Sequence, residues 1–119
     1  MKEKKLRVYI AGRITGLTPY DCHRNFGRAA SRLRAAGYMV ISPDGLDNVL
    51  DPRCRHEEFM RVCYKLIDLP DAVYMLSNWP ESKGARLEHQ YALDHGKKVM
   101  YEGVNGNEIE ALKSNGYTG

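Results

Sequence analysis

The stretch LRVYIAGRITG, residues 6–16, joins a short apolar run to a loop that is bounded by two glycines. The run over residues 6–11 has the length of a strand, and Gly12 follows it directly, with Gly16 four residues later. A nearly continuous apolar run that ends in a turn signal is typical of a strand buried on both faces. We therefore predict a buried strand over residues 6–11 that enters a loop.

Outward from this stretch, strand-length runs alternate with segments of helical spacing. Apolar runs predict further strands over residues 38–42, 71–76 and 98–101. Helical patterns predict helices over residues 20–36, 56–69 and 83–95, and a closing helix over residues 107–114. The expected inner positions are Phe26, Ala29, Ala30 and Leu33 on the first helix, and Phe59, Val62, Cys63 and Leu66 on the second.

This alternation predicts an α/β fold, a three-layer sandwich with helices on both faces of a four- or five-stranded parallel sheet. The length of 119 residues fits one domain, residues 1–119. Right-handed crossovers place all strand-to-helix loops at one sheet edge, where ligands bind in such folds. The loops of interest cover residues 12–19, 43–53 and 77–84.

Composition and charge exclude several classes of function. The net charge is only +3, and the arginines of the first helix have no aromatic neighbours to stack bases, which favours a solvated helix face over a nucleic-acid surface. The three cysteines lack the spacing of a metal site, and no motif calls for a cofactor. No apolar run approaches the roughly 18 residues of a membrane span. We expect a cytoplasmic protein with reduced thiols, no metal and no cofactor.

Two loops carry groups suited to an anion. In the first loop, small residues expose backbone N–H groups and two side chains add donors, although glycines also serve ordinary turns. The loop matches neither a Walker A motif nor a dinucleotide fingerprint. In the third loop, Ser82 is a natural helix N-cap and Gly84 allows close approach to the helix N-terminus. The candidate residues of the first loop are Gly12, Arg13, Ile14, Thr15 and Gly16.

Glu88 is the residue that packing alone explains least well. On the predicted helix over residues 83–95, Ala85, Ala92 and His95 share its face, so the carboxylate is expected on or beside the buried side. A buried carboxylate is costly unless it is paired or used in chemistry. Spacing leaves open a catalytic role and a structural ion pair, for example with Arg13 or a group near Arg86.

Two segments of the chain resemble the DUF4406 family of phage and bacterial proteins. The first is VYIAGRITG, residues 8–16, followed by Asn25-Phe26, LRAAGY over residues 33–38, Val40 and Ser42-Pro43. The second, DAVYML over residues 71–76 with Trp79, Ser82, Gly84-Ala85, Glu88 and Ala92, resembles the family pattern of an aspartate-led strand followed by G-W-x-x-S-x-G-A-x-x-E. The resemblance covers about residues 8–101, and its second half is the more specific.

The DUF4406 family is similar to nucleoside 2-deoxyribosyltransferases and to deoxynucleoside 5′-monophosphate N-glycosidases. The resemblance implies a flavodoxin- or Rossmann-like sheet, a homodimer or higher homo-oligomer, and a glutamate nucleophile at Glu88 with Tyr9 nearby. It also implies that the loop over residues 12–16 and Ser82 hold a phosphate. The transferases have an aspartate at the Ser82 position, so the resemblance favours a nucleoside 5′-monophosphate over a free nucleoside.

Two positions depart from the pattern of these enzymes. Cys63 stands where they carry a supporting aspartate, and Asp68 lies more than one helical turn away from that position. Arg13 replaces a small residue or proline, which either strengthens phosphate contact or narrows the pocket. The cysteine at position 63 is expected to impair turnover more than ligand binding.

Two hypotheses follow. The first is a nucleotide N-glycosidase or deoxyribosyltransferase-like enzyme in which the carboxylate of Glu88 attacks the anomeric carbon. The second is a module that binds a nucleotide or a nucleotide-derived ligand without turnover, which the cysteine at position 63 favours. A phosphoacceptor receiver domain is disfavoured because such domains need a pair of acidic residues after the first strand. In this chain the corresponding stretch, residues 9–16, is YIAGRITG and contains no acidic residue.

Overall fold

A computed structural model of the chain describes residues 6–44, 50, 51 and 53–103. Its strands are β1 (Arg7–Ala11), β2 (Met39–Ile41), β3 (Ala72–Met75) and β4 (Lys98–Tyr101). The helices are α1 (Pro19–Ala35), α2 (His56–Asp68) and α3 (Lys83–Asp94), with a short 3-10 helix, η2 (Trp79–Glu81), before α3. The predicted strands and these three helices are confirmed, with ends that differ by at most one residue. The closing helix predicted over residues 107–114 lies outside the described residues.

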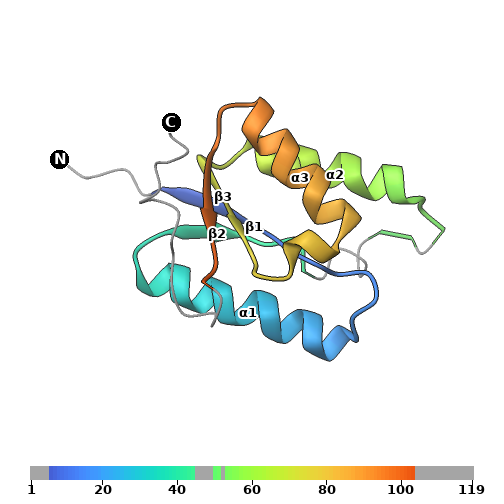
Figure 1. Ribbon diagram of the computed structural model, residues 1–119, viewed down its shortest axis with the longest axis horizontal. Helices are drawn as coiled ribbons and strands as arrows, with labels where there is room; N and C mark the ends of the chain where they lie inside the picture. Colours follow the sequence, from blue (N-terminus) through green and yellow to red (C-terminus); the bar gives the residue numbers. More distant parts are fainter. Residues whose placement is uncertain (1–5, 45–49, 52, 104–119) are drawn as a thin grey trace.

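The strands form one parallel sheet in the order β2-β1-β3-β4. Helix α1 covers one face, and α2 and α3 lie side by side on the other, which gives the predicted three layers (Figure 1). Because each helix runs back against parallel strands, all three helices begin at the carboxyl edge of the sheet. The loops over residues 12–19 and 77–84 therefore meet at that edge, whereas much of the predicted loop over residues 43–53 lies outside the described residues.

The two central strands, β1 and β3, supply most of the core. Residues 8–11 and 72–75 are all fully buried, and successive side chains point to opposite faces. Val8, Ile10 and Tyr74 pack toward α1, whereas Tyr9 and Val73 pack toward α2 and α3. The predicted stripe of α1, Phe26, Ala29, Ala30 and Leu33, is buried as expected.

The inner faces of α2 and α3 differ in detail from the prediction. Cys63 is buried as expected on α2, but its buried companions are Met60 and Ile67. The predicted companions Phe59, Val62 and Leu66 are only partly buried, because residues 60, 63 and 67 form the helical row that faces the sheet. His95 follows the last residue of α3, where it is exposed and its ring stacks on Tyr91 at 3.8 Å. None of the helices in the described part of the chain is both long enough and apolar enough to cross a bilayer.

Gly12 is fixed by close packing at the end of β1. A Cβ built on Gly12 would lie 2.4 Å from Cδ1 of Leu76, a side chain that is 1% exposed and has no room to move. We expect Gly12→Ala to lower the free energy of unfolding by about 1–3 kcal/mol, as overpacking does in other cores. Urea denaturation measures the change.

Gly27 provides the matched control. It lies within α1, and a Cβ there would meet nothing within 4 Å. Gly27→Ala should therefore raise the free energy of unfolding by about 0.5–1 kcal/mol through helix propensity. Equal effects of the two alanine substitutions would contradict the packing at Gly12.

Candidate active site

Glu88 lies on the buried face of α3, against the sheet. It shares that face with Ala85 and Ala92, and its relative exposure is 5%. The small side chains on either side of it let the helix approach the strands closely. The predicted burial of Glu88 is thus confirmed, and the carboxylate faces the protein interior between α3, α2 and β1.

The partner of the carboxylate is Tyr9, at the centre of β1. Its hydroxyl donates a hydrogen bond of 2.6 Å to Oε2 of Glu88, and both residues are buried. Tyr9 reaches this face because alternate residues of β1 point toward α2 and α3. The structure therefore brings together the two residues that the family resemblance implied as neighbours.

The thiol of Cys63 completes the group around Glu88. It extends from the buried row of α2 and interacts with both the Tyr9 hydroxyl and the Glu88 carboxylate. Burial raises the pKa of Glu88 to about 7, against the opposing effect of hydrogen bonds from Tyr9 and Cys63. Burial also raises the pKa of Cys63 to about 12, and that of Tyr9 well above its usual value of 10. The three groups share a water-poor space in which a charge on Glu88 is expensive.

No arginine or lysine among the described residues forms an ion pair with Glu88. The interpretation as a structural ion pair with Arg13 or near Arg86 is therefore wrong, because both side chains are held elsewhere. Arg86 donates to the carbonyl of Pro80 at 2.8 Å, and Arg13 lies on the first loop. Asp68 is also distant: it is exposed and accepts a hydrogen bond from Tyr91 at 2.7 Å, so it does not substitute for an acid at position 63.

The loop over residues 12–16 packs against the loop after β3 through Arg13. The backbone N–H of Arg13 donates to Oδ1 of Asn78 at 3.1 Å, and its guanidinium lies 3.8 Å from Oε1 of Glu81. Nε of Arg13 also donates to the carbonyl of Thr15 at 3.1 Å. Its guanidinium fills the space beside Gly16, where φ is +90° and a side chain would be strained. Arg13 thus closes the loop rather than pointing at Glu88.

Three backbone N–H groups of this loop are left open. Those of Ile14, Thr15 and Gly16 donate to no acceptor in the described ranges, and Thr15 and Gly16 are exposed. Consecutive unpaired N–H groups are suited to hold an anion. The loop therefore offers backbone donors to an anion, and the phosphate that the resemblance implies here stays a prediction.

Helix α3 begins where the sequence predicted, at Lys83. Ser82 is the N-cap, and its Oγ accepts a hydrogen bond from the N–H of Ala85 at 3.0 Å. Beside it, Gly84 faces His56 and Met60 of α2, whose nearest side-chain atoms would lie 3.6 and 3.4 Å from a Cβ at this position. A Cβ at position 84 would therefore make ordinary van der Waals contacts with α2, and the first turns of the two helices lie side by side.

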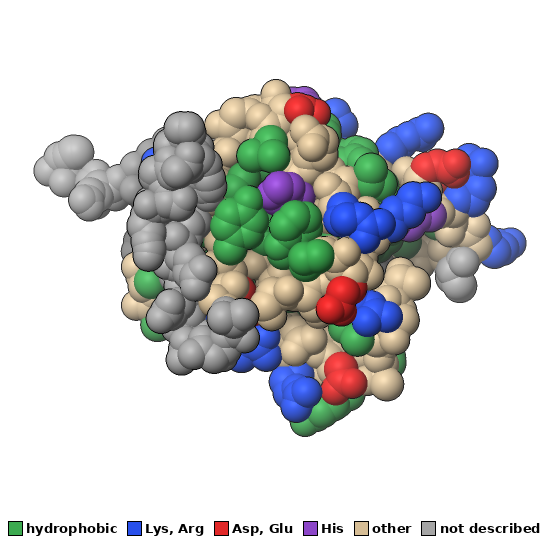
Figure 2. Space-filling view, viewed as in Figure 1, with side chains coloured by type: hydrophobic (Ala, Val, Ile, Leu, Met, Phe, Trp, Pro, Cys, Tyr) green, Lys and Arg blue, Asp and Glu red, His purple; other side chains and the backbone are tan. Residues whose placement is uncertain are grey.

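An open groove runs between these two helix starts. It is lined by His56, Glu57, Met60, Arg61, Tyr64, Lys83 and Leu87. Lys and Arg side chains gather at this end of the molecule, on the right in Figure 2. Two helix N-termini and the cations of Arg61 and Lys83, set against the carboxylate of Glu57, make the groove electropositive.

Sequence reasoning missed Glu102, the other buried acid of the described residues. It follows β4 directly, on the face of the sheet that α1 covers, and it is bound by Arg28 and by the backbone of Ser77. The signal that could have found it is the alternation of side chains along β4. Met100 packs on the face that α1 covers, so the residue two positions later points to the same face. Within the described ranges, no group of three or more His, Cys, Asp or Glu side chains is arranged to hold a metal ion.

A family model described as a domain of unknown function, DUF4406, matches residues 6–101. The matched stretch runs from the residue before β1 to the last residue of β4, and it contains Tyr9, Cys63, Ser82 and Glu88. No curated protein is significantly similar to the chain. Glu102 lies immediately beyond the matched residues.

The raised pKa of Glu88 links stability to pH. The folded state keeps its proton up to about pH 7, whereas the unfolded chain releases it near 4.5. The folded state therefore binds more protons between these values, and stability falls as the pH rises through this window. We expect a loss on the order of 3 kcal/mol in the free energy of unfolding between about pH 5 and pH 8.

Glu88→Gln isolates this contribution. The neutral amide cannot ionise, so the variant should show a flatter dependence of stability on pH and exceed the wild type at pH 8. Chemical denaturation of both proteins across the pH range measures the difference. Parallel curves for the two proteins would show that Glu88 ionises as freely in the folded state as in the unfolded chain.

Proposed function

The chain belongs to the DUF4406 family, and from the geometry of its site we propose that it is a nucleotide N-glycosidase or deoxyribosyltransferase-like enzyme. In this proposal it cleaves the N-glycosidic bond of a nucleoside 5′-monophosphate. The observation that carries the proposal is the buried carboxylate of Glu88, which is bonded to Tyr9 and lacks a cationic partner among the described residues. We further propose a cytoplasmic homodimer or higher homo-oligomer, as the resemblance to such enzymes implies.

The chemistry requires a carboxylate next to the anomeric carbon. The ionised Oε of Glu88 attacks that carbon, the bond to the base breaks, and its electrons leave with the base nitrogen. The resulting glycosyl ester is then attacked by water or by another acceptor, which restores the carboxylate. The hydrogen bond from Tyr9 holds one oxygen of Glu88 and leaves the other for the attack.

The substrate's phosphate has two features of the chain to bind. The first is the row of open N–H groups over residues 14–16, and the second is the start of α3 with Ser82, Gly84 and Lys83. Both lie at the carboxyl edge of the sheet, where helix N-termini favour negative charge. These donors support a phosphorylated substrate over a free nucleoside.

The departing base needs a proton, and the groups around Glu88 are poor acids. The pKa of Cys63 is raised to about 12 by burial, and that of Tyr9 is raised well above 10. A proton donor at neutral pH must have a pKa near neutrality. No described group around Glu88 meets this requirement, so in this proposal the base leaves without help from a general acid and is protonated by solvent after the bond has broken. Bases that leave readily as anions are therefore the preferred substrates.

The direct test is to measure, by chromatography, the release of free base from a panel of ribo- and deoxyribonucleoside 5′-monophosphates. Glu88→Gln should lower the rate by at least about 10³-fold, because it removes the nucleophile. Asp94→Asn is the matched control, since Asp94 is an exposed carboxylate on the same helix and, among the described residues, its side chain accepts a hydrogen bond from Gln90 alone. A Glu88→Gln protein that releases base at the full rate would overturn the proposal.

The pH dependence of base release provides a second test. The nucleophile acts as the carboxylate, and its pKa is about 7. The value of kcat/KM should therefore rise with pH, with its midpoint near 7 and a plateau above about pH 8. A rate that falls over the same range would assign Glu88 the role of an acid instead.

A second candidate function is a module that binds a nucleotide or a nucleotide-derived ligand without turnover. The observation that favours it is Cys63, a thiol of high pKa, where related enzymes are expected to carry an aspartate. For this function, nucleotides stabilise the protein thermally while no free base appears.

Cys63→Asp distinguishes the two candidates. An aspartate at this position places a second carboxylic acid against Glu88 and supplies the missing proton donor. If Cys63 limits turnover, the variant should release base at least about 100-fold faster than the wild type, the usual contribution of a general acid. Cys63→Ser is the control, since it keeps a small polar side chain without adding an acid. Equal rates for Cys63→Asp and Cys63→Ser would show that the cysteine does not limit turnover.

A further inference from the structure

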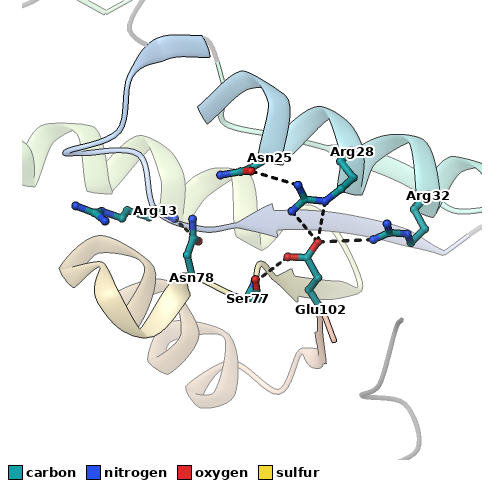
Figure 3. A network of polar contacts seen from close by, with 7 residues as sticks. All are labelled: Arg13, Asn25, Arg28, Arg32, Ser77, Asn78 and Glu102. Atoms are coloured by element: carbon teal, nitrogen blue, oxygen red, sulfur yellow. Dashed lines mark hydrogen bonds and ion pairs between the residues drawn. The ribbon is translucent and has the colours of Figure 1, made fainter. Parts of the chain in front are cut away.

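On the face of the sheet opposite Glu88, the carboxylate of Glu102 joins three separate parts of the chain. Its side chain has no exposed surface. Oε1 accepts a hydrogen bond of 2.9 Å from the backbone N–H of Ser77, directly after β3 and Leu76. Oε2 accepts from Nη2 of Arg28 at 3.0 Å and lies 3.6 Å from Nη1 of Arg32, and both arginines belong to α1 (Figure 3).

The contacts continue from Ser77 into both loops of the candidate site. The next residue, Asn78, accepts a hydrogen bond of 3.1 Å from the backbone N–H of Arg13. Arg13 in turn donates to the carbonyl of Thr15. Figure 3 shows the polar side chains between α1 and the ends of β1, β3 and β4. A continuous path of contacts therefore links α1, through Glu102, to the loop over residues 12–16.

Stability alone is a weak reason for this arrangement. A buried carboxylate loses its hydration, and an apolar side chain after β4 would often serve the core as well. The cluster is also incompletely satisfied, because Tyr74 Oη and Arg32 Nη1 have no hydrogen-bond partner among the described residues. What the carboxylate does supply is a directional acceptor that fixes one backbone N–H at the start of a loop.

We propose that Glu102 is a positioning residue that holds the two phosphate-binding loops in register, and so sets the affinity for the 5′-phosphate. It fixes Ser77, which places Asn78, which in turn holds the backbone of Arg13 at the beginning of the phosphate loop. This inference rests on the proposed function for the nature of the ligand. It assigns Glu102 no contact with the reacting atoms, which lie on the other face of the sheet.

The test compares Glu102→Met with Glu102→Gln. The methionine removes the acceptor at nearly constant volume, whereas the glutamine keeps an oxygen that accepts from Ser77. Glu102→Met should raise KM for the nucleotide about tenfold, the effect of one lost hydrogen bond, and change kcat less than twofold. Glu102→Gln should restore most of the loss. An unchanged KM, or a fall in kcat at constant KM, would overturn the inference.

Two further variants test the same path without changing a buried residue. Asn78→Ala breaks the same path one step later, in a partly exposed loop, and should raise KM by a similar factor even if Glu102→Met does not fold. Arg24→Gln is the control, because Arg24 lies one turn before Arg28 on α1 and pairs locally with Asp21. A rise in KM for Arg24→Gln equal to that of Asn78→Ala would point to a general effect of charge.

A measurement without catalysis separates this inference from the proposed function. Amide hydrogen exchange at Arg13 should accelerate about tenfold in Glu102→Met and remain unchanged in Glu102→Gln, because only the methionine releases Ser77. Binding of inorganic phosphate, followed by NMR, should weaken in the same variant. If wild-type protein cleaves no nucleotide, the proposed enzymatic function fails, and these two measurements still decide the role of Glu102. Unchanged exchange at Arg13 would overturn it.

Discussion

The hydrogen bond between Tyr9 and Glu88 is the contact on which the arrangement of the site depends. It connects the centre of β1 with α3, two elements that are 79 residues apart in the sequence. A buried carboxylate has to be satisfied by neighbouring donors, so the sheet, α3 and the Cys63 thiol of α2 are held around a single polar point. Any change in the depth of α3 against the sheet would move this carboxylate relative to the loops at the edge.

The two faces of the sheet divide the work of the proposed enzyme. The face under α2 and α3 contains the carboxylate and its unusual pKa, whereas the face under α1 contains the ion-paired Glu102. The two acids are satisfied in opposite ways. Glu88 has neutral donors and therefore a costly charge, while Glu102 has two arginines and a backbone N–H. The first arrangement suits a group that changes its state during a reaction, and the second suits a fixed anchor.

The sequence predicted the fold because the deciding patterns are local. Apolar runs over residues 6–11 and 71–76 and the stripe on α1 depend on neighbours only a few residues away. The burial of Glu88 could be predicted from its spacing to Ala85 and Ala92. Its proximity to Tyr9 could be predicted only from the family resemblance.

What could not be predicted depends on contacts that are distant in the sequence. Arg28 and Arg32 were interpreted as part of a solvated helix face, and they turn toward Glu102, about 70 residues later. Arg13 was expected to contact phosphate or to narrow the pocket, and its side chain instead closes its own loop. Long, flexible side chains have several partners within reach, and local periodicity does not choose among them.

The ring stack beside the site gives the protein a spectroscopic property of its own. Trp79 is the single tryptophan of the chain, and it stands at the start of η2, in the loop that leads to Ser82. Its ring stacks on His89 at 4.3 Å, and a ring nitrogen of His89 lies 2.7 Å from the hydroxyl of Tyr101. Because an indole emits according to its immediate surroundings, the intrinsic fluorescence of this protein is a built-in optical reporter of that loop, and requires no added label.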